Sequence, residues 1–314
     1  STLYIRKFKD FTYMVYTSPP FLLLIFSIFQ RFFCSKPVFI VDIRDLYPDT
    51  AIELGVLKNQ YIIRLLKFLE KKVYSSAELI TTVSPGLVNK ISSKTSSKVR
   101  LLTNGADTSF FYPSKRNKED IRGVLEWGMD DFIVLYTGTH GLMEKVETLI
   151  DTADILKNYS QIKFVLVGGG YRKDFLIKYS HSLDLKNVVF WGNEKACILP
   201  LMMSAADVGI VLKKNYPLCE DHLPVKMFEY AACGLPIIGS IHGMASQLII
   251  TEKIGWTVPP ENPQKLSEMI LNIFHNPNLK KELRGDVSKW IQENYSRKKT
   301  SLLLLEYLED MKHV

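Results

Sequence analysis

The stretch LPVKMFEYAACGLPII, residues 223–238, carries two charged side chains in a segment that otherwise predicts a half-buried helix and a strand. Pro224 is typical of the first turn of a helix, and Gly234 is typical of the position just past its end. Lys226 and Glu229 are three residues apart, which places them on one face of that helix. Because helix N-termini attract anions and Lys226 lies in the first turn, we predict an anion site here.

Glycine and small polar residues follow most of the strands that the sequence predicts. An open parallel sheet binds ligands outside the carboxyl ends of its strands, so chemistry is expected at these positions. Glycine lets the backbone approach a ligand closely, although ordinary turns use the same residues. The positions are Thr17 and Ser18, Arg44 and Asp45, Ser84, Asn104 and Gly105, Gly138 to Gly141, Gly168 to Gly170, and Gly192 and Asn193.

Strands and helices alternate along the chain, which favours parallel sheets covered by helices on both faces. The charged stretch 113–123 interrupts this alternation and is predicted to be a linker. We therefore expect an α/β protein with two Rossmann-like domains, residues 1–112 and 113–295, whose parallel sheets face each other across a cleft. The predicted strands are 13–17, 37–43, 78–84, 98–104, 131–138, 163–170, 187–193, 207–212 and 235–240, and the predicted helices include 59–76 and 85–91.

The composition fits this organisation and excludes other classes of protein. At 314 residues, 46% of them apolar, the chain exceeds what one core usually organises. The formal net charge is +7, but the basic residues are spread out, so nucleic acid is not an expected partner. The four cysteines lack metal-ligand spacing. No strand is followed by G-x-G-x-x-G, which argues against a nicotinamide dehydrogenase.

The apolar segment FLLLIFSIFQRFF, residues 21–33, is too short to span a bilayer, which takes about 20 apolar residues. It fits a buried helix of an α/β domain, and it also fits an apolar surface that dips into a membrane interface. The basic balance of the chain could serve an anionic leaflet or a nucleotide substrate. Residues 1–10 lack the apolar run of a signal peptide.

Several segments, in order and spacing, resemble glycosyltransferase family 4 of the GT-B fold. They are NGADTSFFYP at 104–113, KFVLVGGGYRKDFL at 163–176, NVVFWGNEKACILPLMMSAADVGIVL at 187–212 and PVKMFEYAACGLPIIGS at 224–240. In addition, VDIRDLYPDTAIELG at 41–55 and TTVSPGL at 81–87 resemble the N-terminal domain of a branch that builds bacterial surface polysaccharides, capsule and O-antigen among them. That branch includes enzymes that transfer N-acetylfucosamine.

The resemblance implies an enzyme, a glycosyltransferase of the hexosyltransferase class (EC 2.4.-), that retains anomeric configuration and needs no metal or other cofactor. Its implied donor is a nucleotide sugar, with UDP and an N-acetylated amino sugar expected. The implied acceptor is a glycan or a polyprenyl-diphosphate-linked sugar, used in the cytoplasm at the inner face of the cell membrane. Peripheral contact with the anionic leaflet is expected there. No paired carboxylates suggest a covalent intermediate, so front-face substitution is favoured, with the leaving phosphate accepting the acceptor's proton.

For the nucleoside and the donor sugar, the resemblance points to carboxylates. Glu229 matches the second glutamate of an E-x7-E motif and is expected to accept the ribose hydroxyls, since a carboxylate can accept two hydroxyl protons. Asp221 stands at the first glutamate of that motif, which contacts the donor sugar, and Glu220 is a rival for the role.

For the diphosphate, the resemblance points to basic side chains and a helix N-terminus. Lys145 matches a phosphate-binding lysine, although a solvated helix position fits it too. Thr139 stands where the family has an arginine, so Lys226 is the expected replacement. The predicted catalytic residues are Lys226, Lys145, Asp221 and Asp45. The predicted donor-binding residues are Glu229, Pro224, Val225, Gly138, Thr139, His140, Gly141, Gly169 and Asn193.

On the acceptor side, Arg44 and Asp45 stand where many family members place a histidine-containing loop near the reaction centre. A purely structural Arg–Asp pair explains these two residues equally well. Ser18, which follows the first strand, is the third residue predicted on this side.

The ends of the chain raise separate expectations. By resemblance, the terminal helix at 296–314 crosses back to complete the N-terminal domain. Members of the branch carry further strand–helix units before the segment that begins here at Tyr16, so the N-terminal domain is expected to be incomplete. Two rival functions stay open: a UDP-sugar epimerase of GT-B architecture, and a non-catalytic partner subunit of a glycosyltransferase. The substitutions at Thr139 and Asp221 favour the second of these rivals.

Overall fold

The computed structural model describes residues 13–33, 38–192 and 194–311 of the 314-residue chain. The chain forms two compact units, divided between Thr103 and Asn104. This division assigns the terminal helix α14 (Arg297–Asp310) to the second unit. The boundary expected after residue 112 and the return of residues 296–314 to the N-terminal domain remain predictions.

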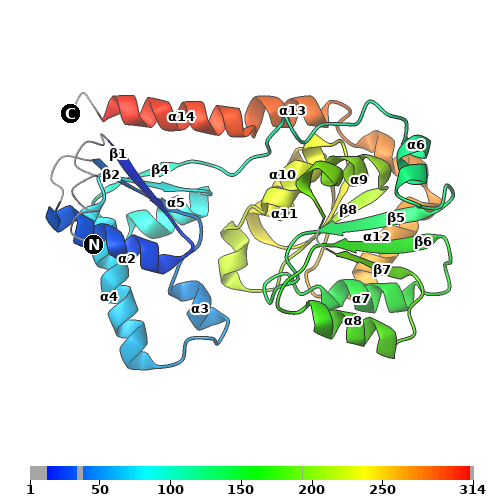
Figure 1. The fold of residues 1–314 in the computed structure, drawn as a ribbon, viewed down its shortest axis with the longest axis horizontal. Helices are drawn as coiled ribbons and strands as arrows, with labels where there is room; N and C mark the ends of the chain where they lie inside the picture. The colour runs from blue at the N-terminus through cyan, green and yellow to red at the C-terminus, as the bar shows by residue number, and fades with distance from the viewer. Residues whose placement is uncertain (1–12, 34–37, 193, 312–314) are drawn as a thin grey trace. The chain divides into compact units, whose positions relative to one another are not determined.

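The first unit is built on a parallel sheet with strand order β1-β2-β3-β4 (Figure 1). Helix α2 packs on β1, β2 and α4, while α5 packs on β4. The strands are β1 (Tyr13–Thr17), β2 (Val38–Ile43), β3 (Leu79–Thr82) and β4 (Lys98–Leu101), and the helices are α2 (Phe21–Phe33), α3 (Asp49–Glu53), α4 (Gln60–Ser76) and α5 (Pro85–Ser92).

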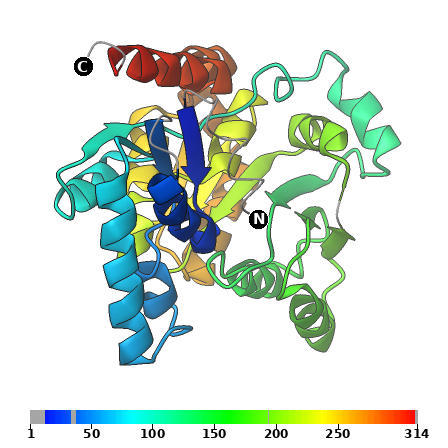
Figure 2. The same cartoon turned by 60° about the vertical axis from the view of Figure 1, so that its left-hand side comes forward.

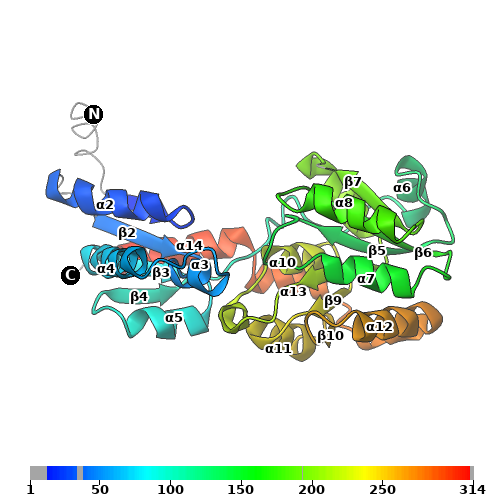
Figure 3. The same cartoon turned by 90° about the horizontal axis from the view of Figure 1, so that it is seen from below.

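The second unit contains a six-stranded parallel sheet with strand order β10-β9-β8-β5-β6-β7 (Figure 3). The chain enters at β5, runs outward through β6 and β7, and returns to the other side of β5 to form β8, β9 and β10. The neighbours β5 and β8 therefore mark the topological switch point, where open α/β sheets form a ligand crevice. The strands are β5 (Phe132–Thr137), β6 (Ile162–Val167), β7 (Val188–Gly192), β8 (Val208–Leu212), β9 (Ile237–Ser240) and β10 (Gly255–Val258).

Helices cover both faces of this sheet, as Figures 1 and 2 show for α9 on one side and for α7 and α8 on the other. One core joins the sheet to α9, α10, α11 and α13, and the other joins it to α7, α8 and α12. Strands β5 and β8 are buried at every residue, as expected for strands covered on both faces. The helices are α6 (Lys118–Val124), α7 (Glu147–Ile155), α8 (Lys173–Ser182), α9 (Leu199–Ala205), α10 (Val225–Ala232), α11 (Gly243–Thr251), α12 (Pro263–His275), α13 (Val287–Asn294) and α14, with 3-10 turns η2 (Ala196–Ile198), η3 (Pro217–Asp221) and η4 (Pro277–Glu282).

The predicted α/β class with two parallel sheets is confirmed, and the described ends of the predicted strands lie within three residues of the observed ones. The predicted linker is wrong over its second half, because residues from Lys118 onward form helix α6. Asn117 caps this helix by accepting a hydrogen bond from the Asp120 amide, and Ile121 and Arg122 are buried. The charged sequence suggested a solvated segment because Arg122 is neutralised by Asp207, which lies far along the chain.

The apolar segment at 21–33 forms α2, and its described side chains divide between two environments. Phe21 and Leu24 are buried, whereas Leu22 and Phe26 are exposed. The helix therefore contributes one face to the core and exposes the other, and its insertion into a membrane interface remains a prediction. Within the described ranges, none of the helices combines the length and the apolar character that crossing a bilayer would take.

Candidate functional site

A cavity of about 600 Å³ opens at the carboxyl edge of the second sheet, beside the switch point between β5 and β8. The loops after β5, β6, β7 and β8 and the start of α10 surround it. Its lining residues are Thr137, Gly138, Thr139, Glu144, Val167, Gly168, Gly169, Glu194, Leu199, Lys213, His222, Pro224, Val225, Lys226 and Glu229.

Two glycine loops form one wall of this cavity and are held together by backbone hydrogen bonds. The Gly138 amide donates to Val167 O at 2.9 Å, and the His140 amide donates to Gly169 O at 2.8 Å. Gly168 has a φ of +131°, and a Cβ there would lie 2.1 Å from Gly138 O. Only glycine permits this conformation and this close approach, so the glycines bring bare backbone to the cavity wall.

Tyr136, the penultimate residue of β5, supports the first glycine loop and the lysine that faces it. Its hydroxyl donates a hydrogen bond to Thr139 O at 2.7 Å. The Lys226 Nζ lies 4.1 Å from the centroid of the Tyr136 ring, a cation–π geometry. The packing is close enough that a Cβ at Gly138 would lie 2.7 Å from the Lys226 Nζ.

Lys226 carries a buried ammonium group. The stem of the side chain is partly exposed, but its Nζ is buried and makes no hydrogen bond to any residue in the described part of the chain. Burial lowers the pKa of Lys226 to about 7; Glu144 and Glu229 act against this shift, and Lys213 adds to it. A buried ammonium without a hydrogen-bonded anion is costly, and a bound anion would relieve that cost.

Glu229 lies one turn further along α10 on the same wall. Burial raises the pKa of its carboxyl, against the opposing effect of Arg297 and Lys226. Pro224 occupies the N-cap of α10, one position earlier than predicted, and no side chain caps the helix start. Gly234, with a φ of +74°, follows the C-cap Cys233, as predicted. The first turns of α10 thus present an uncapped helix N-terminus, an ammonium and a carboxyl to one cavity.

The cavity contains seven of the predicted residues: Gly138, Thr139, Gly169, Pro224, Val225, Lys226 and Glu229. The lining residues do not include His140, Gly141, Lys145 or Asp221. The His140 backbone nevertheless belongs to the first glycine loop, through its bond to Gly169 O. Asn193 lies outside the described residues.

His140 and Lys145 differ from what the sequence suggested. The His140 ring is fully buried, packs against Tyr136 and Phe190, and neither ring nitrogen bonds to a residue that the structure describes. Burial, together with Lys173 and Lys226, lowers its pKa to about 4, so the ring is neutral near pH 7. Lys145 lies in the loop before α7 with a φ of +47°, rather than on the helix. Asp221 ends the turn η3.

Three charged residues that the sequence interpretation missed also line the cavity: Glu144, Glu194 and Lys213. Lys213 follows β8 directly, and its Nζ lies 3.2 Å from Oε1 of Glu144, which comes from the loop after β5. The position of Lys213 at a strand's carboxyl end was a usable signal. Nothing in the sequence near Glu144 indicated a role at the site, because its partner Lys213 is 69 residues further along the chain.

In the first unit, the predicted residues lie near the carboxyl ends of β1 and β2. The Ser18 hydroxyl accepts a hydrogen bond from the Arg44 amide at 3.2 Å. The predicted pairing of Arg44 with its neighbour Asp45 is corrected, because Arg44 Nε lies 2.9 Å from Asp42 Oδ2. Alternate residues of a strand point the same way, which favours residue 42 over residue 45. The hydroxyls of Thr17 and Thr81 also donate to Asp42.

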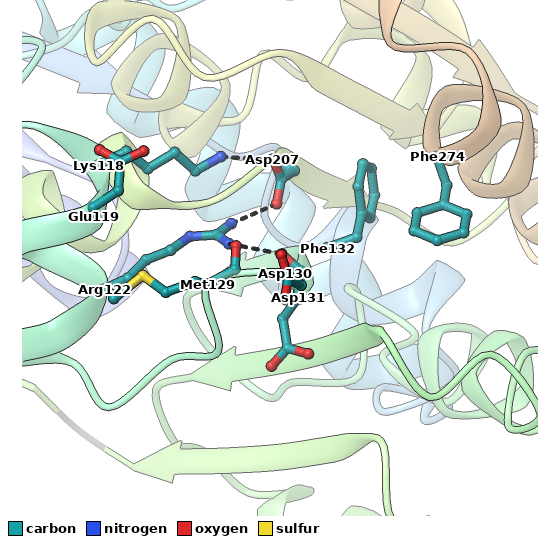
Figure 4. Close-up of a pocket in the computed structure, with 9 residues that line it drawn as sticks. All are labelled: Lys118, Glu119, Arg122, Met129, Asp130, Asp131, Phe132, Asp207 and Phe274. Atoms are coloured by element: carbon teal, nitrogen blue, oxygen red, sulfur yellow. Dashed lines mark hydrogen bonds and ion pairs between the residues drawn. The ribbon is translucent and has the colours of Figure 1, made fainter.

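A second cavity, of about 290 Å³, lies at the opposite edge of the second sheet, where β5 and β8 begin (Figure 4). Its centre is Asp207, which lies 2.6 Å from Lys118 Nζ and 2.8 Å from the Arg122 guanidinium. The Ile133 amide donates to the same carboxylate, and Lys280 Nζ is 3.6 Å away. Burial alone would raise the pKa of Asp207, but Lys118, the Ile133 amide and Lys280 outweigh it and lower the pKa.

The family model of group 1 glycosyl transferases matches residues 117–290, just over half of the chain and most of the second unit. The chain belongs to the group 1 glycosyltransferase family. The match to this family confirms the prediction that the protein is a glycosyltransferase. The narrower placement in a branch of N-acetylfucosamine-type transferases remains a prediction.

Among curated relatives, the probable glycosyltransferase WbjE of Pseudomonas aeruginosa is 24% identical over 285 residues, which are 89% of this chain and 70% of WbjE. The putative teichuronic acid biosynthesis glycosyltransferase TuaH of Bacillus subtilis is 26% identical over 64% of this chain and 50% of its own length. The putative colanic acid biosynthesis glycosyl transferase WcaI of Escherichia coli is 24% identical over 62% and 49%. The chain thus spans about half the length of TuaH and WcaI.

Solved structures show the same fold at low identity. A sucrose-phosphate synthase from Thermosynechococcus elongatus has a TM-score of 0.79 at 21% identity, covering 99% of this chain and 76% of that one. Anabaena HepE in complex with UDP-glucose has a TM-score of 0.79 at 16% identity, covering 98% and 81%. These similarities confirm the GT-B fold class.

Proposed function

We propose that the cavity at the switch point binds the UDP part of a nucleotide sugar and that the protein transfers the sugar with retention of configuration. The observation that carries this proposal is the buried Lys226 ammonium, which lacks a hydrogen-bonded partner among the described residues and lies one helical turn from the Glu229 carboxyl. A nucleoside diphosphate matches both groups, since it carries a diphosphate anion next to a ribose with a vicinal diol.

Each wall of the cavity has a part in donor binding. The diphosphate lies between the uncapped start of α10, at Pro224 and Val225, and the glycine loop at Gly138 and Thr139. Lys226 donates to a phosphate oxygen. Glu229 accepts hydrogen bonds from the ribose hydroxyls, and its partial burial strengthens them. The bare backbone at Gly169 leaves room for the nucleotide.

In the transfer step, the bond between the sugar and the leaving phosphate breaks, and the acceptor oxygen bonds to the same face of the sugar. The acceptor's proton passes to an oxygen of the leaving phosphate. Lys226 and the helix N-terminus stabilise the negative charge that develops on that phosphate. No divalent metal is assigned a part in this scheme. The scheme uses none of the other predicted donor-side residues, which are Lys145, Asp221, His140, Gly141 and Asn193.

TuaH and WcaI are named for teichuronic acid and colanic acid biosynthesis, and these names support our proposal of a part in bacterial surface polysaccharide biosynthesis. We propose an N-acetylated amino sugar as the transferred group and a glycan or polyprenyl-diphosphate-linked sugar as the acceptor. On the acceptor side, Asp45, Arg44 and Ser18 are the candidate contacts. Asp42 holds Arg44 in place through their ion pair.

The test is turnover with a panel of UDP-sugars and glycan or lipid-linked acceptors, with product analysed by NMR. The proposal expects UDP release only with an acceptor and a product linkage of the donor's anomeric configuration. Conversion of the UDP-sugar without any acceptor would instead identify an epimerase. UDP binding without turnover across the panel would point to a non-catalytic subunit.

For location, we propose the cytoplasm, with peripheral contact at the anionic inner leaflet through α4 of the first unit. The side chains of Leu65 and Phe68 are each 56% exposed, and the basic residues Arg64, Lys67 and Lys71 lie on the adjacent side of the same helix. An apolar stripe flanked by basic side chains fits an interfacial helix on an anionic surface. The exposed Leu22 and Phe26 of α2, which packs on α4, extend the apolar surface.

Liposome sedimentation tests this location. Wild type is expected to sediment with anionic vesicles and to stay in solution with zwitterionic ones, and a Leu65→Ser, Phe68→Ser double variant is expected to lose binding. Val124→Ser, at an exposed apolar position of the second unit, is the matched control. Absence of wild-type binding to anionic vesicles would remove the proposal.

A further inference from the structure

Lys213 and Glu144 belong to the two loops that meet at the switch point. Lys213 follows β8, and Glu144 lies in the loop that follows β5. The loops are tied by backbone as well, because the Lys214 amide donates to Met143 O at 2.9 Å, while the Lys213 amide donates to Ser240 O at 3.2 Å. The two side chains are therefore held at the sheet edge by main-chain contacts on either side.

Both side chains are largely buried, with exposed fractions of 12% for Lys213 and 17% for Glu144, and both line the cavity. Their ion pair of 3.2 Å uses one carboxylate oxygen, Oε1. The other oxygen, Oε2, lies 2.7 Å from where a Cβ on Gly141 would stand. The lysine ammonium has three donors, so one interaction with Glu144 leaves capacity for a ligand.

The two lysines of the cavity differ in how they are paired. Burial is the main cause of the lowered pKa of Lys226, and Glu144 and Glu229 oppose this shift. Lys213 forms an ion pair with Glu144, whereas the Lys226 Nζ has no hydrogen-bond partner among the described residues. An anion of two linked phosphates would supply a partner for each lysine.

We propose that Lys213 is a second phosphate-contacting lysine of the donor site and that Glu144 is a positioning residue that holds it. This assignment rests on the proposed function. Members of the family have an arginine where this chain has Thr139, in the loop after β5. Lys213 would supply the missing positive charge from the loop after β8, on the other side of the switch point.

Binding of uridine, UMP and UDP, measured by calorimetry, tests the assignment. Lys213→Met is expected to weaken UDP by about tenfold to hundredfold, the usual range for a charge-assisted hydrogen bond, and to leave uridine unchanged. Lys213→Arg is expected to restore most of the UDP affinity. Lys214→Met is the matched control, because Lys214 lies over the Tyr216 ring and is not among the residues lining the cavity.

Glu144→Gln separates a phosphate contact from a merely structural ion pair. The glutamine carbonyl can still accept a hydrogen bond from Lys213 and hold it, while the negative charge beside the diphosphate is removed. UDP is therefore expected to bind a few-fold more tightly, opposite in sign to Lys213→Met. If the ion pair were only structural, Lys213→Met and Glu144→Gln would lower the melting temperature by similar amounts. In both variants the ratio of UDP affinity to uridine affinity would then equal that of wild type. That unchanged ratio would overturn the assignment. A wild type that shows no preference for UDP over uridine would instead overturn the proposed function.

Discussion

Charged clusters lie at both ends of the neighbouring strands β5 and β8, and they differ in how completely their charges are paired. At the edge where β5 and β8 begin, the Asp207 carboxylate is fully matched by Lys118, Arg122 and the Ile133 amide. At the edge where the same strands end, the Lys226 ammonium is buried without a hydrogen-bonded partner in the described ranges. A saturated cluster stabilises a fold, whereas an unsaturated one is arranged for a missing ligand.

Further hydrogen bonds of Arg122 explain why the saturated cluster, which consists of Asp207, Lys118, Arg122 and the Ile133 amide, is structural. Arg122 also donates to the carbonyl oxygens of Gly128, Met129 and Asp131, so α6 is fixed to the loop before β5 and to the residue before β8. Lys118 and Arg122 both bind Asp207, so these three charges are paired within the protein. We therefore interpret the Asp207 cluster as a structural one.

The largest effect is expected when the saturated cluster is broken. Asp207→Ala leaves the buried Arg122 without its carboxylate and is expected to lower the free energy of unfolding by about 3–5 kcal/mol. Chemical denaturation followed by circular dichroism measures this. Lys186→Ala, which removes an exposed ion pair with Asp184, is the control and should change stability by less than about 0.5 kcal/mol. Equal effects of the two substitutions would contradict the structural role of Asp207.

A smaller effect of opposite sign is expected at the unsaturated cluster. Lys226→Met removes a buried, unpartnered ammonium and is expected to raise the free energy of unfolding by about 1–3 kcal/mol at pH 6. The pKa of Lys226 is about 7 in the folded protein, below its ordinary value of 10.5. Between these values the unfolded chain binds more protons, so wild-type stability rises with pH there, by up to about 1.4 kcal/mol per pH unit.

The gain from Lys226→Met should therefore shrink as the pH rises from 7 towards 10. Denaturation curves of both proteins at pH 6, 8 and 9 measure this difference. A variant that is less stable than wild type at pH 6, or a difference that does not change with pH, would show that the ammonium is satisfied within the folded protein.

The smallest effects are expected within the donor cavity, where Lys213 is both partnered and ligand-facing. Its loss is expected to weaken UDP binding and to lower stability less than Asp207→Ala does, because Glu144 has one ion pair at 3.2 Å whereas Asp207 binds Lys118, Arg122 and the Ile133 amide. A stability loss comparable to that of Asp207→Ala would place Lys213 with the saturated cluster instead. Melting temperatures of Lys213→Met and Asp207→Ala, measured side by side, decide between these outcomes.

Local patterns predicted the sheet and much of the cavity wall. Alternation of apolar strands with helices gave the strand positions, and the glycines at 138 and 168–170 marked strand ends where the backbone approaches a ligand. Lys226 and Glu229 were predicted because a proline, a glycine and helical spacing, all local signals, place them on one face.

Long-range pairing accounts for what local patterns missed. Arg122 made the segment around it resemble a solvated linker, because nothing nearby in the sequence reveals Asp207, which is 85 residues away. The pairing of Glu144 with Lys213 spans 69 residues and was invisible for the same reason. Arg44 was paired with its neighbour rather than with Asp42, since adjacency in sequence is a poor guide to which side a strand residue faces.

The central claim is that Lys226 binds the diphosphate of the donor. Calorimetric titration of UDP into wild type and Lys226→Met at pH 6.5, with Lys214→Met as control, tests it most directly. The account predicts binding to Lys226→Met that is about tenfold to hundredfold weaker than to wild type, with the control unchanged. Equal UDP affinity in wild type and Lys226→Met would contradict it.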